Sequence, residues 1–226
     1  MTFTRRDFVQ TTGMATLAYA LGGCQGRPDS PGIPKPNVLF ISLDDLNDWI
    51  EPLGGHPQAK TPHLNRYARE GVNFSKCSCA SPSCLPSRTA LLTGTPAYRS
   101  GVYSNYQYWR EVMPDAVTLP QYFMANGYYA AGAGKIFHHH QGGAFHDAAS
   151  FEDFQMMPNP PDAPMPAEKL NGLPEYGSPN TDWGAWPPRE EDSVDHRTAD
   201  YAIDFLGREH QRPFFLAVGI FRPHMP

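Results

Sequence analysis

The stretch NVLFISLDD, residues 37–45, is a run of apolar residues that ends in two adjacent carboxylates. A run of this length is typical of a strand that is buried on both faces of a parallel sheet. In open α/β sheets, ligands bind beyond the carboxyl ends of the strands. The stretch therefore predicts a core strand of an α/β sheet, with the acid pair Asp44 and Asp45 at the edge where ligands bind.

Strand and helix patterns alternate along the rest of the chain. Thr61 and Pro62 have the N-cap and first-turn preferences of a helix that stops at Gly71. Helices are expected over residues 61–71, 85–94, 118–127 and 193–210, and further strands over residues 72–77, 128–134 and 213–219. Strands that alternate with helices predict a layered α/β fold.

Residues 141–193 show no convincing periodic pattern and are rich in proline. The chain has 24 prolines, and many of them lie between Pro158 and Pro188. A segment of this length without regular structure is uncommon inside a compact domain, and it is generally a functional lid, a binding loop or a flexible segment. We expect it to form a loop over the site.

Composition and charge restrict the class of protein. At 226 residues, with 40% hydrophobic and 18% charged residues, the chain fits a soluble globular protein with a sizeable core. Its formal net charge of −5 gives no basic surface that would favour nucleic acid, and the sequence has no basic helix, aromatic RNA-binding motif or zinc finger. We therefore expect no nucleic-acid partner.

The N-terminal segment reads as an export signal rather than as part of the fold. Arg5 and Arg6 precede a moderately apolar stretch that ends in LGGC, which resembles a twin-arginine signal followed by a lipoprotein processing site at Cys24. The alternative is an ordinary secretory signal cleaved near Gly23. This layout predicts a bacterial periplasmic protein or a membrane-anchored lipoprotein with a lipid on Cys24. The expected division is a signal at 1–24, a linker at 25–36 and a folded domain at 37–226.

Chemically active side chains follow the predicted strands and open one predicted helix. The set comprises Asp44, Asp45, Cys84, Arg88, Lys135, His138, Arg222 and His224. Asp44 and Asp45 offer hard oxygen ligands that suit Ca²⁺ or Mg²⁺, although two carboxylates cannot complete a shell of about six to eight oxygens. The alternative for such an acid pair is a solvated turn.

Cys84 has several interpretations. At the start of a helix, free backbone N–H groups and the helix dipole favour negative charge, so the location predicts a lowered thiol pKa or a place for an anionic ester group. Arg88 lies about one turn further on and can reach back to the same point. On the residues alone, Cys84 is a candidate nucleophile, metal ligand or core residue. Cys77 and Cys79 are interpreted as small core residues on one face of a strand, because the C-x-C-x4-C spacing lacks a second pair of zinc ligands.

The sequence around Cys84 carries a more specific signal. CLPSRTALLTG, residues 84–94, resembles the C-x-P-S-R-x-x-x-L-T-G signature of the sulfatase family, in which the cysteine is oxidised to formylglycine after synthesis. NVLFISLDDL, residues 37–46, is similar to the family's first strand and metal-binding acid pair. The resemblance implies an alkaline-phosphatase-like layered sheet with helices on both faces. Similarity to the iduronate-2-sulfatase group lies in YWR, TLPQYFMANGY, GKIFH and PFFLAVGIFRPHMP, residues 108–110, 118–128, 134–138 and 213–226.

The resemblance also implies a role for each matching residue. Cys84 becomes formylglycine through a maturation enzyme, and the hydrated aldehyde attacks sulfur. Asp44 and Asp45, with residue 84, hold one Ca²⁺ that stabilises charge on the sulfate. The other roles are that Arg88 secures the formylglycine hydrate, Lys135 neutralises sulfate charge, His138 stabilises or deprotonates the hydrate, and His224 binds sulfate or acts near the leaving oxygen.

The expected function is hydrolysis of sulfate esters of a carbohydrate, such as a 2-O-sulfated uronate. Sulfatases are considerably longer than this chain. The resemblance therefore implies a second metal-binding pair and a further sulfate-binding lysine beyond Pro226, a sheet that is incomplete at its C-terminal side, and little or no activity of residues 1–226 alone. Two alternatives remain open. One is a phosphatase or phosphodiesterase of the same superfold, which typically has Ser or Thr in place of Cys84, and the other is an inert lipid-tethered protein that binds sulfated glycans.

Overall fold

The computed structural model describes residues 35–138, 145–157, 166–178 and 181–224. Contacts between Cα atoms divide the chain into Met1–Lys35 and Pro36–Pro226, and the fold below is that of the second unit. The predicted signal and nearly all of the predicted linker lie outside the described residues. Within the described ranges, no helix has the length and apolar character needed to cross a membrane.

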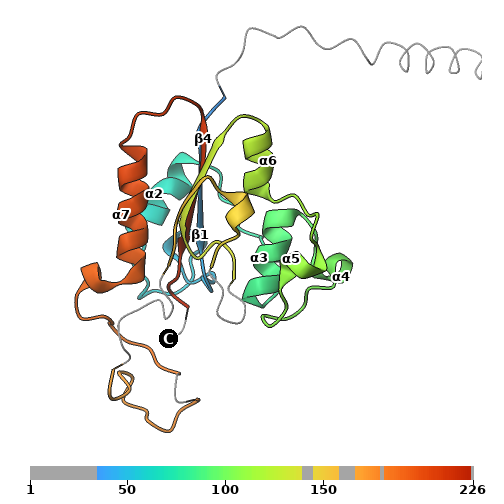
Figure 1. Cartoon of the computed structure of the whole chain (residues 1–226). Helices are drawn as coiled ribbons and strands as arrows, with labels where there is room; N and C mark the ends of the chain where they lie inside the picture. Colours follow the sequence, from blue (N-terminus) through green and yellow to red (C-terminus); the bar gives the residue numbers. More distant parts are fainter. Residues whose placement is uncertain (1–34, 139–144, 158–165, 179–180, 225–226) are drawn as a thin grey trace, which may run out of the picture. The chain divides into compact units, whose positions relative to one another are not determined.

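A parallel sheet of four strands forms the centre of this unit (Figure 1). All three neighbouring pairs of strands are parallel. The carboxyl ends of the strands therefore meet at one edge of the sheet, where α/β folds bind their ligands. The order across the sheet is β1 (Val38–Leu43), β4 (Phe214–Ile220), β2 (Tyr129–Gly134) and β3 (Asp153–Gln155).

Local capping signals start the helices. Thr118 and Gln121 form a capping box at the start of α6, in which each side chain accepts a hydrogen bond from the other residue's backbone N–H. The Ser193 hydroxyl accepts a hydrogen bond from the His196 N–H at the start of α7. The helices are α2 (Pro62–Glu70), α3 (Cys84–Thr93), α4 (Ala97–Ser100), α5 (Trp109–Val112), α6 (Leu119–Ala125) and α7 (Val194–Leu206), with 3-10 turns at Glu51–Leu53, Ala148–Ser150 and Glu190–Asp192.

Helices cover both faces of the sheet, as the α/β prediction requires. Figure 1 shows α7 on one side of the strands and α3 with α6 on the other. The central strand β4 alternates between two apolar clusters, because Phe215 and Ala217 belong to the cluster that contains α3 residues, whereas Leu216 and Val218 belong to the cluster that contains α7 residues. This period-two alternation is that of a strand buried on both faces.

The predicted strand over residues 72–77 is wrong. These residues form no strand, and 80% of Val72 and 74% of Phe74 are exposed. Cys77 and Cys79 are exposed as well, so the interpretation of these two cysteines as core residues is also wrong. A strand needs a neighbour to satisfy its backbone N–H and C=O groups. None of the strands in the described part of the chain pairs with this segment.

β1 and the proline-rich segment differ from the predictions in a smaller way. Among the described strands β1 pairs only with β4, and its Leu39 and Ile41 are 42% and 49% exposed, so β1 is not buried on both faces.

Residues 141–193 are not wholly irregular, because β3 and two 3-10 turns lie in their described part. Sequence periodicity missed β3 because a strand of three residues is too short to show a period.

Candidate active site

Predicted site residues from four elements meet at the carboxyl edge of the sheet. Asp44 follows β1, Lys135 follows β2 and His224 lies on the turn after β4, while Cys84 opens α3. A backbone hydrogen bond of 3.0 Å from the Asp44 N–H to the Ile220 carbonyl holds the ends of β1 and β4 together. The topology of the sheet thus brings residues that are far apart in the sequence to one point.

Asp44 is the centre of this group. It is buried, and its carboxylate accepts hydrogen bonds from Arg88 Nη2 at 2.7 Å and from Lys135 Nζ. Burial alone raises the pKa of the Asp44 carboxyl, but the positive charges of Arg88 and Lys135 outweigh burial and hold this pKa below its usual value. Asp44 is therefore ionised at neutral pH and fixes both cations.

Arg88 ties α3 to the loop after β2. Its buried guanidinium donates through Nη1 to the backbone carbonyls of Lys135 and Ile136, the latter at 3.0 Å, and through Nη2 to Asp44. Three acceptors from two other elements match the fork of donors that a guanidinium offers. Arg88 thus fixes the position of Asp44 and of the backbone at Lys135.

Lys135 holds a buried positive charge beside Cys84. Only 1% of Lys135 is exposed, and its Nζ lies 3.9 Å from the Cys84 Sγ atom. The ring of Phe221 lies 4.7 Å from Nζ and adds a cation–π contact. Burial of this ammonium is tolerated because it is paired with Asp44.

The acidity of the Cys84 thiol differs from the prediction. Burial raises the pKa of Cys84 above its usual value, and the positive charge of Lys135 does not offset burial together with the negative charges of Asp44 and Asp45. The prediction of a lowered pKa from the helix start is therefore wrong. An unmodified Cys84 is protonated at neutral pH, which disfavours it as a thiolate nucleophile.

A set of metal-ligating groups lies at the same point. Ligand atoms of Asp44, Cys84 and His224 all lie within 4.8 Å of one another. Asp45 is exposed, has a backbone φ of 56°, and places its carboxylate 3.7 Å from His224 Nε2. Carboxylate oxygens suit a hard cation, and an oxygen in place of the Cys84 sulfur would make the set harder. These residues therefore fit a hard divalent cation.

Comparison with known proteins assigns the chain to a family. The family model named Sulfatase matches residues 36–226. The chain belongs to the sulfatase family. A relative named Sulfatase from Formosa agariphila is 35% identical over 205 residues, which cover 86% of this sulfatase chain and 40% of the relative. Human iduronate 2-sulfatase is 28% identical over 205 residues, which cover 84% of this chain and 35% of that protein.

A solved structure also resembles this sulfatase chain. It is a protein in complex with its substrate D-glucosamine-2-N,6-O-disulfate, with a TM-score of 0.57 and 25% identity over 84% of this chain and 35% of that one. The chain thus spans less than half the length of the relatives that it matches. Sulfatases generally use a formylglycine and a metal ion, and the group around Cys84 contains residue types that both require.

Sequence reasoning missed Asp195, which positions part of the candidate site. The Asp195 carboxylate on α7 accepts hydrogen bonds from the backbone N–H groups of Phe221 at 2.6 Å and Arg222 at 2.9 Å. These bonds fix the turn that carries His224. The sequence shows only an acidic residue in the first turn of a helix, which the helix dipole explains equally well.

Asn105 is a second positioning residue that the sequence did not reveal. Its side-chain oxygen accepts hydrogen bonds from the Leu85 N–H and the Ser83 hydroxyl, both at 2.9 Å. These bonds fix the start of α3 on either side of Cys84. An asparagine in an irregular stretch is usually a turn residue, so no local signal distinguishes it.

The structure places His138 at a separate cavity. Its ring lies edge-on to Phe145, with 6.1 Å between the ring centroids. His138 lines a cavity of about 510 Å³ together with Trp109 and the ion pair of Arg110 and Asp147. The role implied for His138 at the formylglycine stays a prediction.

Proposed function

We propose that the protein hydrolyses sulfate esters of a carbohydrate through a formylglycine made from Cys84. The observation that carries the proposal is the position of the Cys84 Sγ atom, which lies 4.0 Å from Asp44 Oδ2 and 3.9 Å from Lys135 Nζ at the start of a helix. A sulfate group next to Cys84 would meet a buried ammonium and the free N–H groups of α3, which favour anions. Human iduronate 2-sulfatase among the relatives supports a carbohydrate substrate.

Each residue of the group has a part in the proposed reaction. The Cys84 sulfur marks where the formylglycine oxygens would lie. When formed, the formylglycine supplies a hydrated aldehyde, one hydroxyl of which attacks sulfur as the ester alcohol leaves, while the other expels sulfate and regenerates the aldehyde. Lys135 would neutralise sulfate charge, Arg88 would hold Asp44 and the Lys135 backbone in place, and His224 would donate a proton to the leaving oxygen or bind sulfate.

The metal is proposed to be Ca²⁺, held by Asp44, Asp45 and residue 84. The donor set supports this choice, because carboxylate oxygens prefer hard cations to soft ones. When bound, the ion would stabilise negative charge on a sulfate oxygen. These ligands do not fill a calcium shell of about six to eight oxygens, so others would have to complete it.

The proposal predicts that Cys84 is converted to an aldehyde. The chain is expressed together with an active formylglycine-generating enzyme, and the peptide that spans Cys77 to Arg88 is fragmented in a mass spectrometer. The expected result is formylglycine at position 84 and unmodified thiols at Cys77 and Cys79, which are matched controls on the same peptide. An intact thiol at Cys84, with a known sulfatase converted in the same cells, would contradict the proposal and favour the inert glycan-binding alternative.

The protein is also proposed to be exported and lipid-anchored. The support is the order of Arg5, Arg6, an apolar stretch and Cys24 at the N-terminus. Export by the twin-arginine route would carry the folded, already modified domain into the periplasm. Metabolic labelling with a radioactive fatty acid in a bacterial host should label the protein, and Cys24→Ala should abolish the label; equal labelling of both would overturn the anchor.

A further inference from the structure

A largely buried ion pair joins Arg110 of α5 to Asp147, which lies between β2 and β3. The guanidinium donates through Nε to Asp147 Oδ1 at 3.3 Å and through Nη2 to Asp147 Oδ2 at 2.5 Å. The two side chains are 18% and 9% exposed. Two parallel donors to one carboxylate are the geometry in which an arginine pair is strongest. The pair therefore fixes the segment around Asp147 relative to α5.

Further hydrogen bonds tie this pair to the start of α6. Arg110 Nη1 donates to the Ala116 carbonyl at 2.6 Å, two residues before the N-cap Thr118. The Ser150 hydroxyl donates to Asp147 Oδ2 at 2.6 Å and lies 2.7 Å from the Thr118 hydroxyl. Ser150 and Thr118 are both buried. Removal of one charged partner would therefore leave the other in a region with little water and without its counter-charge.

The elements on both sides of the pair pack against the end of β2. The Trp109 ring on α5 is stacked on the Phe137 ring, with 5.5 Å between the centroids and 6° between the planes. The Phe137 N–H donates a hydrogen bond of 3.1 Å to the Phe145 carbonyl. The ion pair thus holds together the two elements that enclose Phe137, which lies two residues after Lys135.

The Phe145 ring connects this arrangement with the candidate site. It is buried, lies 5.8 Å from Lys135 Nζ, and stands edge-on to the His138 ring. The Phe221 ring lies 4.7 Å from the same Nζ atom and packs edge-on against Phe145, with 6.5 Å between the centroids. Two phenyl rings thus line the Lys135 ammonium and keep water from it, and a charge attracts an anion more strongly where water is excluded.

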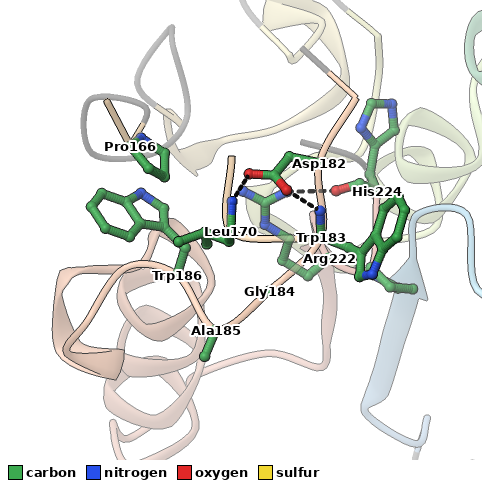
Figure 2. A pocket seen from close by; sticks show the side chains of 10 residues that line it. Pro166, Leu170, Asp182, Trp183, Gly184, Ala185, Trp186, Arg222 and His224 are labelled. Atoms are coloured by element: carbon green, nitrogen blue, oxygen red, sulfur yellow. Dashed lines mark hydrogen bonds between the residues drawn. The ribbon is translucent and has the colours of Figure 1, made fainter. Parts of the chain in front are cut away.

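The two phenyl rings are held by different bonds. Phe221 belongs to the turn after β4, where Arg222 Nη1 donates to the His224 carbonyl at 2.6 Å in the wall of a cavity of about 400 Å³ (Figure 2). Phe145 belongs to the segment that Asp147 anchors two residues further on. A change at the ion pair should therefore move Phe145 and leave the turn after β4 in place.

We propose that the ion pair positions Lys135 for the sulfate group, and that it acts through the Phe145 ring. Arg110 and Asp147 are thus positioning residues, and this inference rests on the proposed function and adds them to it. A charged group in a binding site keeps its productive position only when the residues around it are themselves fixed. Without the pair, Phe145 can leave the ammonium and water can enter, so that sulfate is bound less tightly.

Nuclear magnetic resonance of the full chain with labelled histidine and phenylalanine tests the first step without turnover. The wild type should give a nuclear Overhauser effect between the His138 and Phe145 rings. Arg110→Gln and Asp147→Asn should remove it. Arg110→Lys should restore part of it, because lysine keeps the charge but loses the two parallel donors. A ring contact that is unchanged in both charge-removing variants would overturn the proposal.

Matched controls separate this local effect from a loss of the fold. Glu152→Gln and Arg212→Gln break a more exposed ion pair further along the chain, and the contact between the His138 and Phe145 rings should survive in both. The rings of Phe205 and His210, with 4.6 Å between their centroids, carry the same labels and should stay in contact in every variant.

A milder variant is Ser150→Ala. It removes one hydrogen bond to the Asp147 carboxylate without removing a charge, so it keeps the test decisive if a charge variant does not fold. The effect between the His138 and Phe145 rings should be weaker in this variant than in the wild type, and an effect of equal strength would count against the proposal.

Titration with inorganic sulfate tests the second step on the labelled-lysine signal of Lys135. Arg110→Gln should weaken sulfate binding roughly three- to tenfold. In a Phe145→Leu background the same change should have no further effect, because the pair acts through that ring. Sulfate affinity that is unchanged in Arg110→Gln, fully additive losses in the double variant, or no sulfate binding to the wild type would overturn the inference. The formylglycine test above does not depend on these results, so failure of the inference and failure of the proposed function are distinguishable.

Discussion

Replacement of Asp44 by asparagine is expected to lower the free energy of unfolding by about 3–5 kcal/mol, because it leaves two buried cations without their counter-charge. Arg88 and Lys135 are 7% and 1% exposed, and both pair with this one carboxylate. In the variant, the two positive charges repel each other in a region with little water. Urea unfolding of the wild type and of Asp44→Asn, with EDTA present so that no metal contributes, measures the difference.

Asp45→Asn is the matched control. Asp45 is the next residue and carries the same group, but its carboxylate is exposed. Exposed charges contribute about 0–1 kcal/mol, and asparagine tolerates the positive φ of this position. Equal losses in the two variants would contradict the central role of Asp44. Calcium titration without EDTA should show weaker binding in both variants, since each removes a proposed ligand; unchanged calcium binding in both would overturn the proposed ligand set.

The Asp44 contribution to stability should also depend on pH, with a definite sign. Arg88 and Lys135 hold the pKa of Asp44 below its usual value in the folded protein. The unfolded chain therefore takes up a proton at a higher pH than the folded one, and the contribution is fully present above the unfolded pKa of about 3.9. It is lost as pH falls through the lower, folded pKa. The stability difference between wild type and Asp44→Asn should thus be constant from about pH 7 to pH 5 and shrink below about pH 4.

The sequence predicted the residues of the candidate site better than it predicted the edges of the sheet. Asp44, Lys135 and His224 could be predicted to meet, because strands of a parallel sheet end at one edge and each residue follows a strongly apolar strand. Cys84 and Arg88 could be added because they open a helix whose glycine stop is clear. This reasoning needs only local patterns and one rule of topology.

The features of the fold and of the candidate site that the sequence did not predict depend on contacts between residues that are distant in the sequence. Asp195 and Asn105 position the site by accepting hydrogen bonds from backbone N–H groups that are distant in the sequence. Neither residue stands in a local sequence pattern that would reveal this role. Val72 and Phe74 have strand-like side chains, yet they find no neighbouring strand among the described residues. The thiol pKa of Cys84 was mispredicted for the same reason, since burial by the tertiary fold outweighs the charge preference of the helix start.

Lys135 reaches Asp44 because β2 and β4 approach each other closely at their carboxyl ends. This close approach depends on two glycines that face each other in the sheet. Gly134 pairs with Gly219 in the sheet, and the Lys135 N–H donates to the Gly219 carbonyl at 2.9 Å. A Cβ atom at Gly219 would collide with the Lys135 backbone, including its nitrogen at 2.7 Å. The atoms it meets are backbone atoms, which cannot rotate away as a flexible side chain would.

Gly219→Ala is therefore expected to lower the free energy of unfolding by about 3 kcal/mol, near the upper end of the usual cost of overpacking. The Lys135 carbonyl that would be displaced is an acceptor for Arg88, so calcium binding at the Asp44 group should weaken in the same variant. Gly101→Ala is the control, because that glycine has a φ of +77° and open space around it. An alanine there meets no neighbouring atom, so the variant should lose only the about 1–2 kcal/mol of stability that a left-handed backbone conformation costs a residue with a Cβ atom. Urea unfolding compares the two variants. A smaller loss at Gly219 than at Gly101 would mean that the strand ends can separate without cost, and that the backbone contact does not set the geometry between Lys135, Arg88 and Asp44.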